Sequence, residues 1–179
     1  EAGLKYFVLG ALSSGMLLYG ASLVYGFTGT TSFDALATMF KGLGGEGPSV
    51  GLVVGMVFII AGLAFKVSAV PFHMWTPDVY EGAPTPVTAF MSVAVKAGAF
   101  AAFFRVFSVA FESAYEDWWA ILWWLSVLTM VVANFIATVQ VSGKRMLAYS
   151  GIAHAGYHMV AIVADNETAA AAMGKDVTS

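Results

Sequence analysis

Residues 50–80 read VGLVVGMVFIIAGLAFKVSAVPFHMWTPDVY, and this stretch decides the fold class of the chain. It carries no charge before Lys66, and it is longer than the roughly 20 residues that a helix needs to cross about 30 Å of hydrocarbon. Pro71 lies inside the same run, where a proline removes a backbone hydrogen bond and clashes with the preceding turn. The stretch therefore predicts a membrane helix that is broken near Pro71. A simple proline kink is the plainer alternative.

The whole chain has too little charge for a soluble protein. Of its 179 residues, 59% are hydrophobic and 11% are charged, whereas an average soluble domain is about 25% charged. The net charge is −3 and there is no cysteine. This composition excludes an ordinary soluble enzyme, a disordered tail and a nucleic-acid binder, which needs a basic face. The lack of cysteine excludes a disulfide framework, a thiolate metal site and an iron–sulfur cluster.

Five apolar runs are long enough to cross a bilayer as helices at about 1.5 Å rise per residue. Uninterrupted runs of this length favour helices over the alternating pattern of a membrane barrel. The sequence therefore predicts an all-α, polytopic membrane helix bundle over residues 1–164, followed by a polar tail or the start of a loop at residues 165–179. The expected spans are Leu4–Phe27, Val50–Tyr80, Val87–Phe111, Trp118–Val141 and Met146–Ala164.

Charges in the connections indicate how the bundle is oriented. With five alternating helices, the start of the chain, the connection at residues 78–84 and the Lys144-Arg145 turn fall on one side. That side also carries Lys5, and the positive-inside rule assigns it to the cytoplasm. Because the sequence starts without methionine or a signal-peptide pattern and ends in a polar stretch, we expect an internal piece of a longer polytopic protein.

Three titratable residues lie near the centres of predicted spans. Lys66 is in the second run, Lys96 is near the centre of the third and His154 is at the centre of the fifth, so all three are expected near the bilayer midplane. A lysine there costs roughly 2.5–3.5 kcal/mol on insertion scales, and burial disfavours its charged form. A proton relay requires a base that exchanges protons near neutral pH, so these three residues are the candidate relay. A broken helix at Pro71 beside Lys66 is typical of an ion pathway.

Structural roles for the same residues stay open. The lysines could be ion-pair partners or could line a polar packing interface, but no carboxylate falls near the centre of a predicted span, so an acidic partner is expected elsewhere. His154 and His158 share a helix face, where they could pass a proton or bind a metal, yet no third ligand is evident and polar packing is simpler. The sequence therefore predicts no metal site and no cofactor-binding site. An aromatic belt is expected at Trp118, Trp119, Trp123 and Trp124.

Several motifs resemble one family of membrane subunits. The most specific is PFHMWTPDVY at residues 71–80, and it is accompanied by EAGLKYF at residues 1–7, KRMLAYS at residues 144–150 and HAGY at residues 154–157. Together they are similar to subunit N of the bacterial proton-translocating NADH:quinone oxidoreductase, respiratory complex I, which belongs to the antiporter-like membrane subunits. The resemblance runs from Glu1 to about Ala164.

The resemblance implies that this chain is the middle of a larger antiporter-like fold. The family's broken helix falls on residues 50–80, and its two pathway lysines fall on Lys66 and Lys96. The family's ion-pair glutamate lies on the helix before residue 1, which fits the lack of a carboxylate near the centres of the predicted spans. No family motif is carried onto His158 or onto the tail after Ala164.

The resemblance also implies a proton-translocating subunit of an enzyme complex. Quinone reduction elsewhere would drive proton transfer through the midplane lysines, and no redox chemistry is expected in this chain. NADH, FMN, iron–sulfur clusters and quinone would lie on partner subunits, with no cofactor here. Expected partners are the other membrane subunits of complex I and the lipid bilayer, with the quinone pool acting indirectly and no nucleic acid. The expected location is the bacterial inner (plasma) membrane, with the start of the sequence in the cytoplasm.

Two other functions stay open at this point. A subunit of a multisubunit Na⁺/H⁺ antiporter would use a similar lysine pathway, although the Trp75–Tyr80 run favours the respiratory subunit. A structural membrane subunit without its own ion path would use its buried lysines to hold neighbouring helices. The residues alone do not distinguish H⁺ from Na⁺ as the transported ion.

Overall fold

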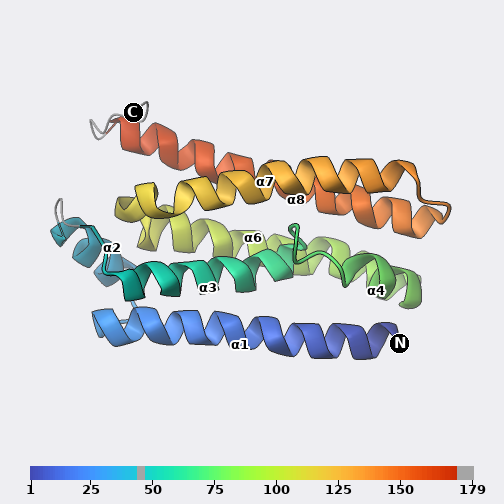
Figure 1. The fold of residues 1–179 in the computed structure, drawn as a ribbon, viewed down its shortest axis with the longest axis horizontal. Coiled ribbons are helices and arrows are strands. Elements are labelled where there is room, and N and C mark those ends of the chain that lie inside the picture. The colour runs from blue at the N-terminus through green and yellow to red at the C-terminus, as the bar shows by residue number, and fades with distance from the viewer. Residues whose placement is uncertain (44–46, 173–179) are drawn as a thin grey trace.

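The computed structural model describes residues 1–43 and 47–172, and within these ranges the chain is helical and contains no strand. The long helices lie side by side, so the molecule is an elongated bundle (Figure 1). Two π-helical segments and one 3₁₀ turn, labelled η, lie among the α-helices. The order is α1 (Ala2–Thr28), α2 (Phe33–Gly42), α3 (Val50–Val67), α4 (Thr76–Gly82), α5 (Thr85–Phe90), η2 (Met91–Val95), α6 (Lys96–Arg105), η3 (Val106–Ala110), η4 (Glu112–Ala114), α7 (Tyr115–Thr138) and α8 (Gly143–Ala172).

Within the described ranges, five helical segments are long and apolar enough to cross a membrane. Helix α1 packs along α3 and α7 packs along α8, each pair running antiparallel (Figure 1). This confirms the predicted all-α bundle of about five membrane helices. The five segments are Ala2–Thr28, Val50–Val67, Thr85–Ala110, Glu112–Thr138 and Gly143–Asn166.

The span that starts at Val50 is broken where the sequence predicted it. Helix α3 ends at Val67, Ser68 adopts a left-handed conformation with φ 67°, and turns continue until α4 starts at Thr76. Pro71 lies within these turns and follows a cis peptide bond. A simple kink would keep the helix continuous, so the broken-helix prediction is confirmed and the kink is not what forms.

Buried hydrogen bonds hold the break in place. The Val70 N–H donates to the Thr129 hydroxyl of α7 at 2.9 Å. The Thr76 hydroxyl donates to the Ser68 hydroxyl at 2.7 Å, and the Trp75 indole N–H donates to the Phe65 carbonyl at 3.1 Å. Backbone groups that leave a helix inside a membrane need such partners, because hydrocarbon offers none.

Small residues let α1 and α3 approach closely. A Cβ atom built on Gly20 would lie 2.7 Å from the Gly55 carbonyl oxygen and 2.8 Å from the Cβ of Phe58. The Ser13 hydroxyl donates to the Gly62 carbonyl across the same interface at 3.2 Å. Close packing at small residues with an interhelical hydrogen bond is the usual way in which membrane helices associate.

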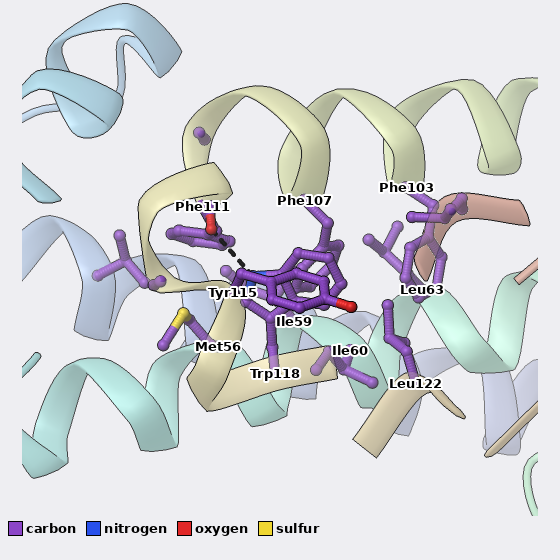
Figure 2. Packing of buried hydrophobic residues seen from close by; sticks show 14 of the residues in the cluster. Met56, Ile59, Ile60, Leu63, Phe103, Phe107, Phe111, Tyr115, Trp118 and Leu122 are labelled. Carbon is purple, nitrogen blue, oxygen red and sulfur yellow. Dashed lines mark hydrogen bonds between the residues drawn. The ribbon is translucent and has the colours of Figure 1, made fainter. Parts of the chain in front are cut away.

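The largest apolar cluster joins α3, the third span and α7 (Figure 2). Trp118 is its centre: the side chain is 0% exposed, its ring lies edge-on to Phe107 at 5.1 Å, and its N–H donates to the Phe111 carbonyl at 2.9 Å. Trp118 therefore belongs to the core and not to the predicted aromatic belt. Trp124, in contrast, is 59% exposed, as a residue on the lipid face would be.

Two elements differ from the expected boundaries. Helix α2, at Phe33–Gly42, lies between the first two predicted spans, where no element was predicted from the sequence. It buries Leu36 and Phe40 on one face, a four-residue spacing typical of a helix. Helix α8 continues to Ala172, so residues 165–172 of the predicted polar tail are helical, in keeping with the alanine run there. Residues 173–179 of that tail lie outside the described residues.

Candidate functional site

Lys96 is buried in the bundle and spans the gap between two helices. It is the first residue of α6, directly after the η2 segment, and only 8% of it is exposed. Its ammonium donates to the backbone carbonyl of Gly151 on α8 at 3.0 Å. Among the described residues, no carboxylate lies within ion-pair distance of this ammonium. The lysine is thus held by a neutral dipole and has no fixed counter-charge within the described structure.

Lys96 lines a cavity of about 670 Å³ between the third span and α8. Three further titratable residues line the same cavity, all from α8: His154, His158 and Asp165. The His154 Nδ1 atom lies 2.8 Å from the Ser150 carbonyl oxygen, and because a carbonyl only accepts, this nitrogen carries the proton of the neutral ring. The Nε2 atom of this tautomer is then a hydrogen-bond acceptor.

Lys66 lies in the last turn of α3 and is half-buried. It lines a separate cavity of about 280 Å³, whose other lining residues come from α1 and include Tyr6, Gly10 and Ser14. The structure thus brings Lys96 and His154 together at one cavity and places Lys66 at another.

An apolar layer joins the part of α3 around Lys66 to the wall of the Lys96 cavity. Ala64 and Val67 flank Lys66 on α3, and they pack with Ala155 and Met159 of α8 in a buried cluster. Phe100 of α6 packs against the same cluster and also lines the Lys96 cavity. The sequence indicated that the three residues lie at similar depth along their spans, but it did not reveal this layer. Depth along a span does not specify how each helix is rotated about its own axis.

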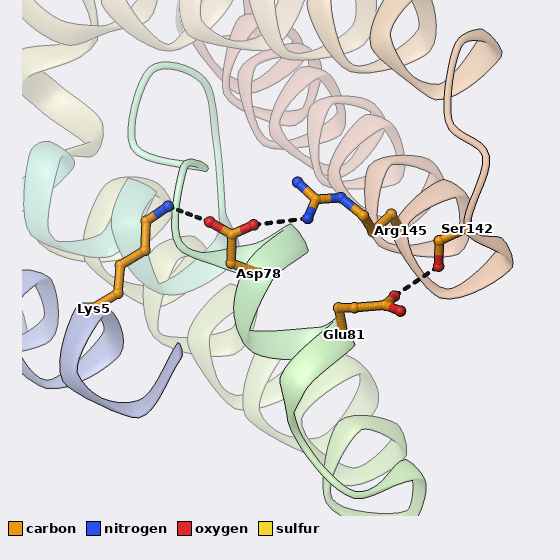
Figure 3. Close-up of polar contacts among 5 residues, drawn as sticks. All are labelled: Lys5, Asp78, Glu81, Ser142 and Arg145. Atoms are coloured by element: carbon orange, nitrogen blue, oxygen red, sulfur yellow. Dashed lines mark hydrogen bonds and ion pairs between the residues drawn. The ribbon is translucent and has the colours of Figure 1, made fainter. Parts of the chain in front are cut away.

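Sequence reasoning missed a cluster of ion pairs at the end of the bundle where α1 begins (Figure 3). The Asp78 carboxylate of α4 is paired with Lys5 of α1, and its other oxygen lies 2.9 Å from a guanidinium nitrogen of Arg145 on α8. The Ser142 hydroxyl donates to the Glu81 carboxylate at 2.7 Å. The start of the chain, residues 78–84 and the Lys144-Arg145 turn were expected to share one side, and this is confirmed (Figure 1); the pairing itself needed the structure.

Asp78 lies outside the five membrane-spanning segments, and its surroundings favour the charged form. The hydrogen bond from Lys5 holds the pKa of the Asp78 carboxyl below its usual range, and the charges of Lys5 and Arg145 act in the same direction, against a smaller opposing effect of burial. The carboxylate therefore stays ionised at neutral pH and fastens three helices together.

Comparison with known proteins identifies the family. The family described as "NADH:quinone oxidoreductase/Mrp antiporter, TM" matches residues 1–177. The chain is 59% identical over 164 residues to NADH-quinone oxidoreductase subunit N of Rhodospirillum rubrum, an alignment that covers 92% of this chain and 33% of that protein. It is 58% identical over 164 residues to NADH-quinone oxidoreductase subunit N 1 of Rhizobium meliloti, covering 92% of this chain and 34% of that protein. The chain therefore spans about a third of the length of these relatives.

Solved structures share the fold. A chain of respiratory complex I from Thermus thermophilus matches with a TM-score of 0.73 and 45% identity, over 90% of this chain and 34% of that chain. A chain of the Mrp complex from Dietzia matches with a TM-score of 0.80 over 90% of this chain and 29% of that chain, but at 24% identity it supports the fold alone. By sequence and by fold, this multi-pass membrane chain belongs to the NADH:quinone oxidoreductase/Mrp antiporter family.

Proposed function

We propose that this chain is part of the proton-translocating membrane subunit N of a bacterial NADH:quinone oxidoreductase and that it relays protons through Lys66, Lys96 and His154. The observation that carries the proposal is the Lys96 ammonium, which is buried, bound to one backbone carbonyl and has no carboxylate within ion-pair distance among the described residues. An ionisable group inside a membrane is costly and is kept for function. The relatives named subunit N, at 59% and 58% identity, support the assignment.

The two members of the relay that share a cavity have complementary chemistry. The charged form of Lys96 has one hydrogen bond, to the Gly151 carbonyl, and no ion pair among the described residues. The protein therefore stabilises this ammonium less than it would stabilise a lysine in an ion pair. His154 faces the same cavity with Nε2 as acceptor. A proton that leaves the ammonium reaches the imidazole through the cavity, leaving a neutral amine and a charged ring.

Lys66 would take its part from the other side of the apolar layer. It lies beside the broken segment at Pro71 and faces α1, the side on which a counter-charge from a preceding helix would fit. A shift of that counter-charge during quinone reduction would change the charge preference of Lys66, and the change would act on Lys96 through the intervening apolar residues. In this proposal NADH, FMN, iron–sulfur clusters and quinone belong to partner subunits.

The proposed setting is the bacterial inner membrane, among other membrane subunits of complex I, with the start of this sequence in the cytoplasm. Lys5 and Arg145 at that end of the bundle support the orientation. A cation-antiporter subunit is the second candidate, because the matching family includes both NADH:quinone oxidoreductase and Mrp antiporter subunits. A structural subunit without an ion path is the third, and it would use Lys96 only to join α6 to α8.

Proton pumping by assembled complex tests the proposal. The full-length subunit carrying Lys66→Ala or Lys96→Arg is incorporated into the complex, reconstituted in liposomes, and NADH-driven proton uptake is measured with a pH-sensitive dye. We expect both variants to assemble and to lose most of their pumping, because alanine has no proton to relay and arginine does not release its own. Lys144→Ala, an exposed lysine outside the relay, is the matched control and should pump normally.

Three outcomes separate the candidates. Wild-type pumping by assembled Lys66→Ala and Lys96→Arg complexes would contradict the relay and favour the structural role. Loss of assembly in both variants, with normal pumping in the fraction that assembles, would do the same. Uptake that follows a Na⁺ gradient and not NADH oxidation would favour the antiporter subunit.

A further inference from the structure

The titratable residues of α8 form a stripe that leads away from Lys96. His158 lies one turn beyond His154, and Asp165 lies about two turns beyond His158, so the steps are roughly 6 Å and 10 Å along the helix. At about 100° per residue, the three positions fall within a narrow sector of one helix face. All three, together with Lys96, line the same cavity.

The stripe ends at the opposite end of the bundle from the Asp78 ion pairs (Figure 1). Asp165 is exposed in the last turn of the fifth membrane span, next to Asn166. The Asn166 amide donates to the Ser108 hydroxyl of η3 at 2.8 Å and so fixes this end of α8 against the third span. The cavity thus runs from a lysine inside the membrane to a carboxylate at the membrane boundary.

The spacing of the stripe does not suit a metal ion. Among the described residues, no group of three histidine, cysteine, aspartate or glutamate side chains is close enough to hold one. His154 and His158 are both exposed on α8, and ionisable side chains within membrane segments face a water-filled cavity or a polar protein interior and not lipid. A cavity of about 670 Å³ has room for roughly twenty waters at about 30 Å³ each.

We propose that this face of α8 is a hydrated proton path from Lys96 to the membrane boundary at Asp165, with His158 as a proton-carrying residue. The inference rests on the proposed relay and extends it beyond His154. A proton leaves the Lys96 ammonium for the His154 imidazole, passes through water to the His158 imidazole and is taken by the Asp165 carboxylate, which releases it to water. His154, His158 and Asp165 return to their starting states, and Lys96 is left as a neutral amine that takes up its next proton from the proposed relay.

The groups that face this path from the third span are compatible with it. Ser92 offers a hydroxyl near Lys96, while Phe100 and Phe104 supply the apolar walls. The Phe100 ring lies 4.9 Å from the His158 ring, which restricts where the imidazole can turn. A purely structural histidine would make the same ring contact, so the experiment has to separate packing from proton transfer.

Accessibility to a water-soluble reagent tests whether the path is hydrated. These 179 residues contain no cysteine, so labelling of a cysteine introduced among them is measured against the unsubstituted assembled complex as background. Ala161→Cys places the thiol in the cavity wall, and Leu128→Cys is the exposed control on α7. The contact between Met130 of α7 and Gly156 of α8 shows that the two positions lie at similar depth along the bundle. A membrane-impermeant methanethiosulfonate should label the first at least about tenfold faster than the second, since thiolates react and form only in water.

Proton pumping tests the role of His158. In assembled complex, His158→Gln keeps the hydrogen-bonding capacity of the side chain but cannot carry the proton, and it should lower the pumping rate at least about tenfold, since one acid–base group contributes about 10²–10⁴-fold. His158→Glu, which titrates again, should recover part of the rate with a shifted pH profile. A merely structural histidine would give equal rates and unshifted profiles in both variants.

The outcomes distinguish this inference from the relay on which it rests. If Lys96→Arg stops pumping while His158→Gln pumps normally and Ala161→Cys is not labelled, the α8 path is wrong and the relay stands. If Lys96→Arg pumps normally, the relay itself fails and the α8 path fails with it. Labelling of Ala161→Cys without any effect of His158→Gln would show a hydrated cavity in which His158 carries no proton, which overturns the proposal.

Discussion

Replacing Lys96 by methionine would separate the charge of the relay from the space that it fills. Methionine is unbranched and flexible, so it can follow the course of the lysine stem without disturbing the cavity wall. The substitution removes the 3.0 Å charge-assisted hydrogen bond to the Gly151 carbonyl, a loss of about 1.5–3 kcal/mol. Gly151 lies within helix α8, so the substitution at Lys96 changes no residue of that helix.

The same substitution removes a cost of similar size. An ammonium that is only 8% exposed within a membrane costs roughly 2.5–3.5 kcal/mol on insertion scales. Because the two contributions have opposite signs, the free energy of unfolding should lie between about 0.5 kcal/mol below and about 2 kcal/mol above that of the wild type. Proton relay, in contrast, should be lost completely, because a thioether carries no proton at any accessible pH.

Two measurements on one preparation test this reasoning. The thermal unfolding midpoint of assembled complex with Lys96→Met should stay within a few degrees of the wild type, and NADH-driven proton uptake in liposomes should fall to background. A large drop of the midpoint would show that the lysine is chiefly a structural link between α6 and α8. Uptake at the wild-type rate would refute the relay.

Three further predictions concern the bundle. The folded-state pKa of Asp78 lies below its unfolded value of about 3.9, so its contribution to stability is present at neutral pH and is lost as the pH falls through the folded pKa. Asp78→Asn should remove this acid sensitivity, and it should cost less than about 1 kcal/mol for each partly exposed ion pair. Trp118→Ala should lower the free energy of unfolding by about 3–5 kcal/mol, because it empties the centre of the core. Gly20→Leu should separate α1 from α3 and prevent assembly, whereas Gly15→Leu, at a position with open space, should assemble normally.

Each of these predictions has a direct measurement. Unfolding midpoints of the assembled complex between pH 7 and pH 3 test Asp78, and equal acid sensitivity of the wild type and Asp78→Asn would contradict its role. Denaturation in detergent tests Trp118, where a loss below about 1 kcal/mol would mean that the core collapses around the gap. Recovery of assembled complex from membranes tests the glycines, and equal yields would show that α1 tolerates a larger separation from α3.

The sequence predicted the spans well because membrane helices need long apolar runs that nothing else in a sequence imitates. It also predicted the break, because proline cannot continue the hydrogen bonds of a helix. It did not predict the left-handed conformation of Ser68. It also did not predict the hydrogen bond from Val70 to Thr129, because these two residues are far apart in the chain. Helix α2 could have been found from the four-residue spacing of its buried residues, a signal that is weak in so short a segment.

The site was predictable in depth but not in direction. Counting residues along each span placed Lys96 and His154 at similar depth, and they do line one cavity. The same count could not show that Lys66 faces α1, because the rotation of α3 depends on which of its neighbours pack against Ala64 and Val67. The Asp78 pairs were missed for a related reason: charge counting identified the shared end, while the choice of partner is a tertiary property.

The apolar layer of Ala64, Val67, Ala155 and Met159 between the two lysines acts in electrical terms as an insulator. Coulomb forces are strongest across a medium of low dielectric constant, so a change of charge at Lys66 is felt at Lys96 with little screening. The buried residues of this layer carry no side chain that binds a proton, so the layer itself offers no titratable group. In the proposed relay, a change of charge at Lys66 therefore alters the charge preference of Lys96 before any proton moves between them.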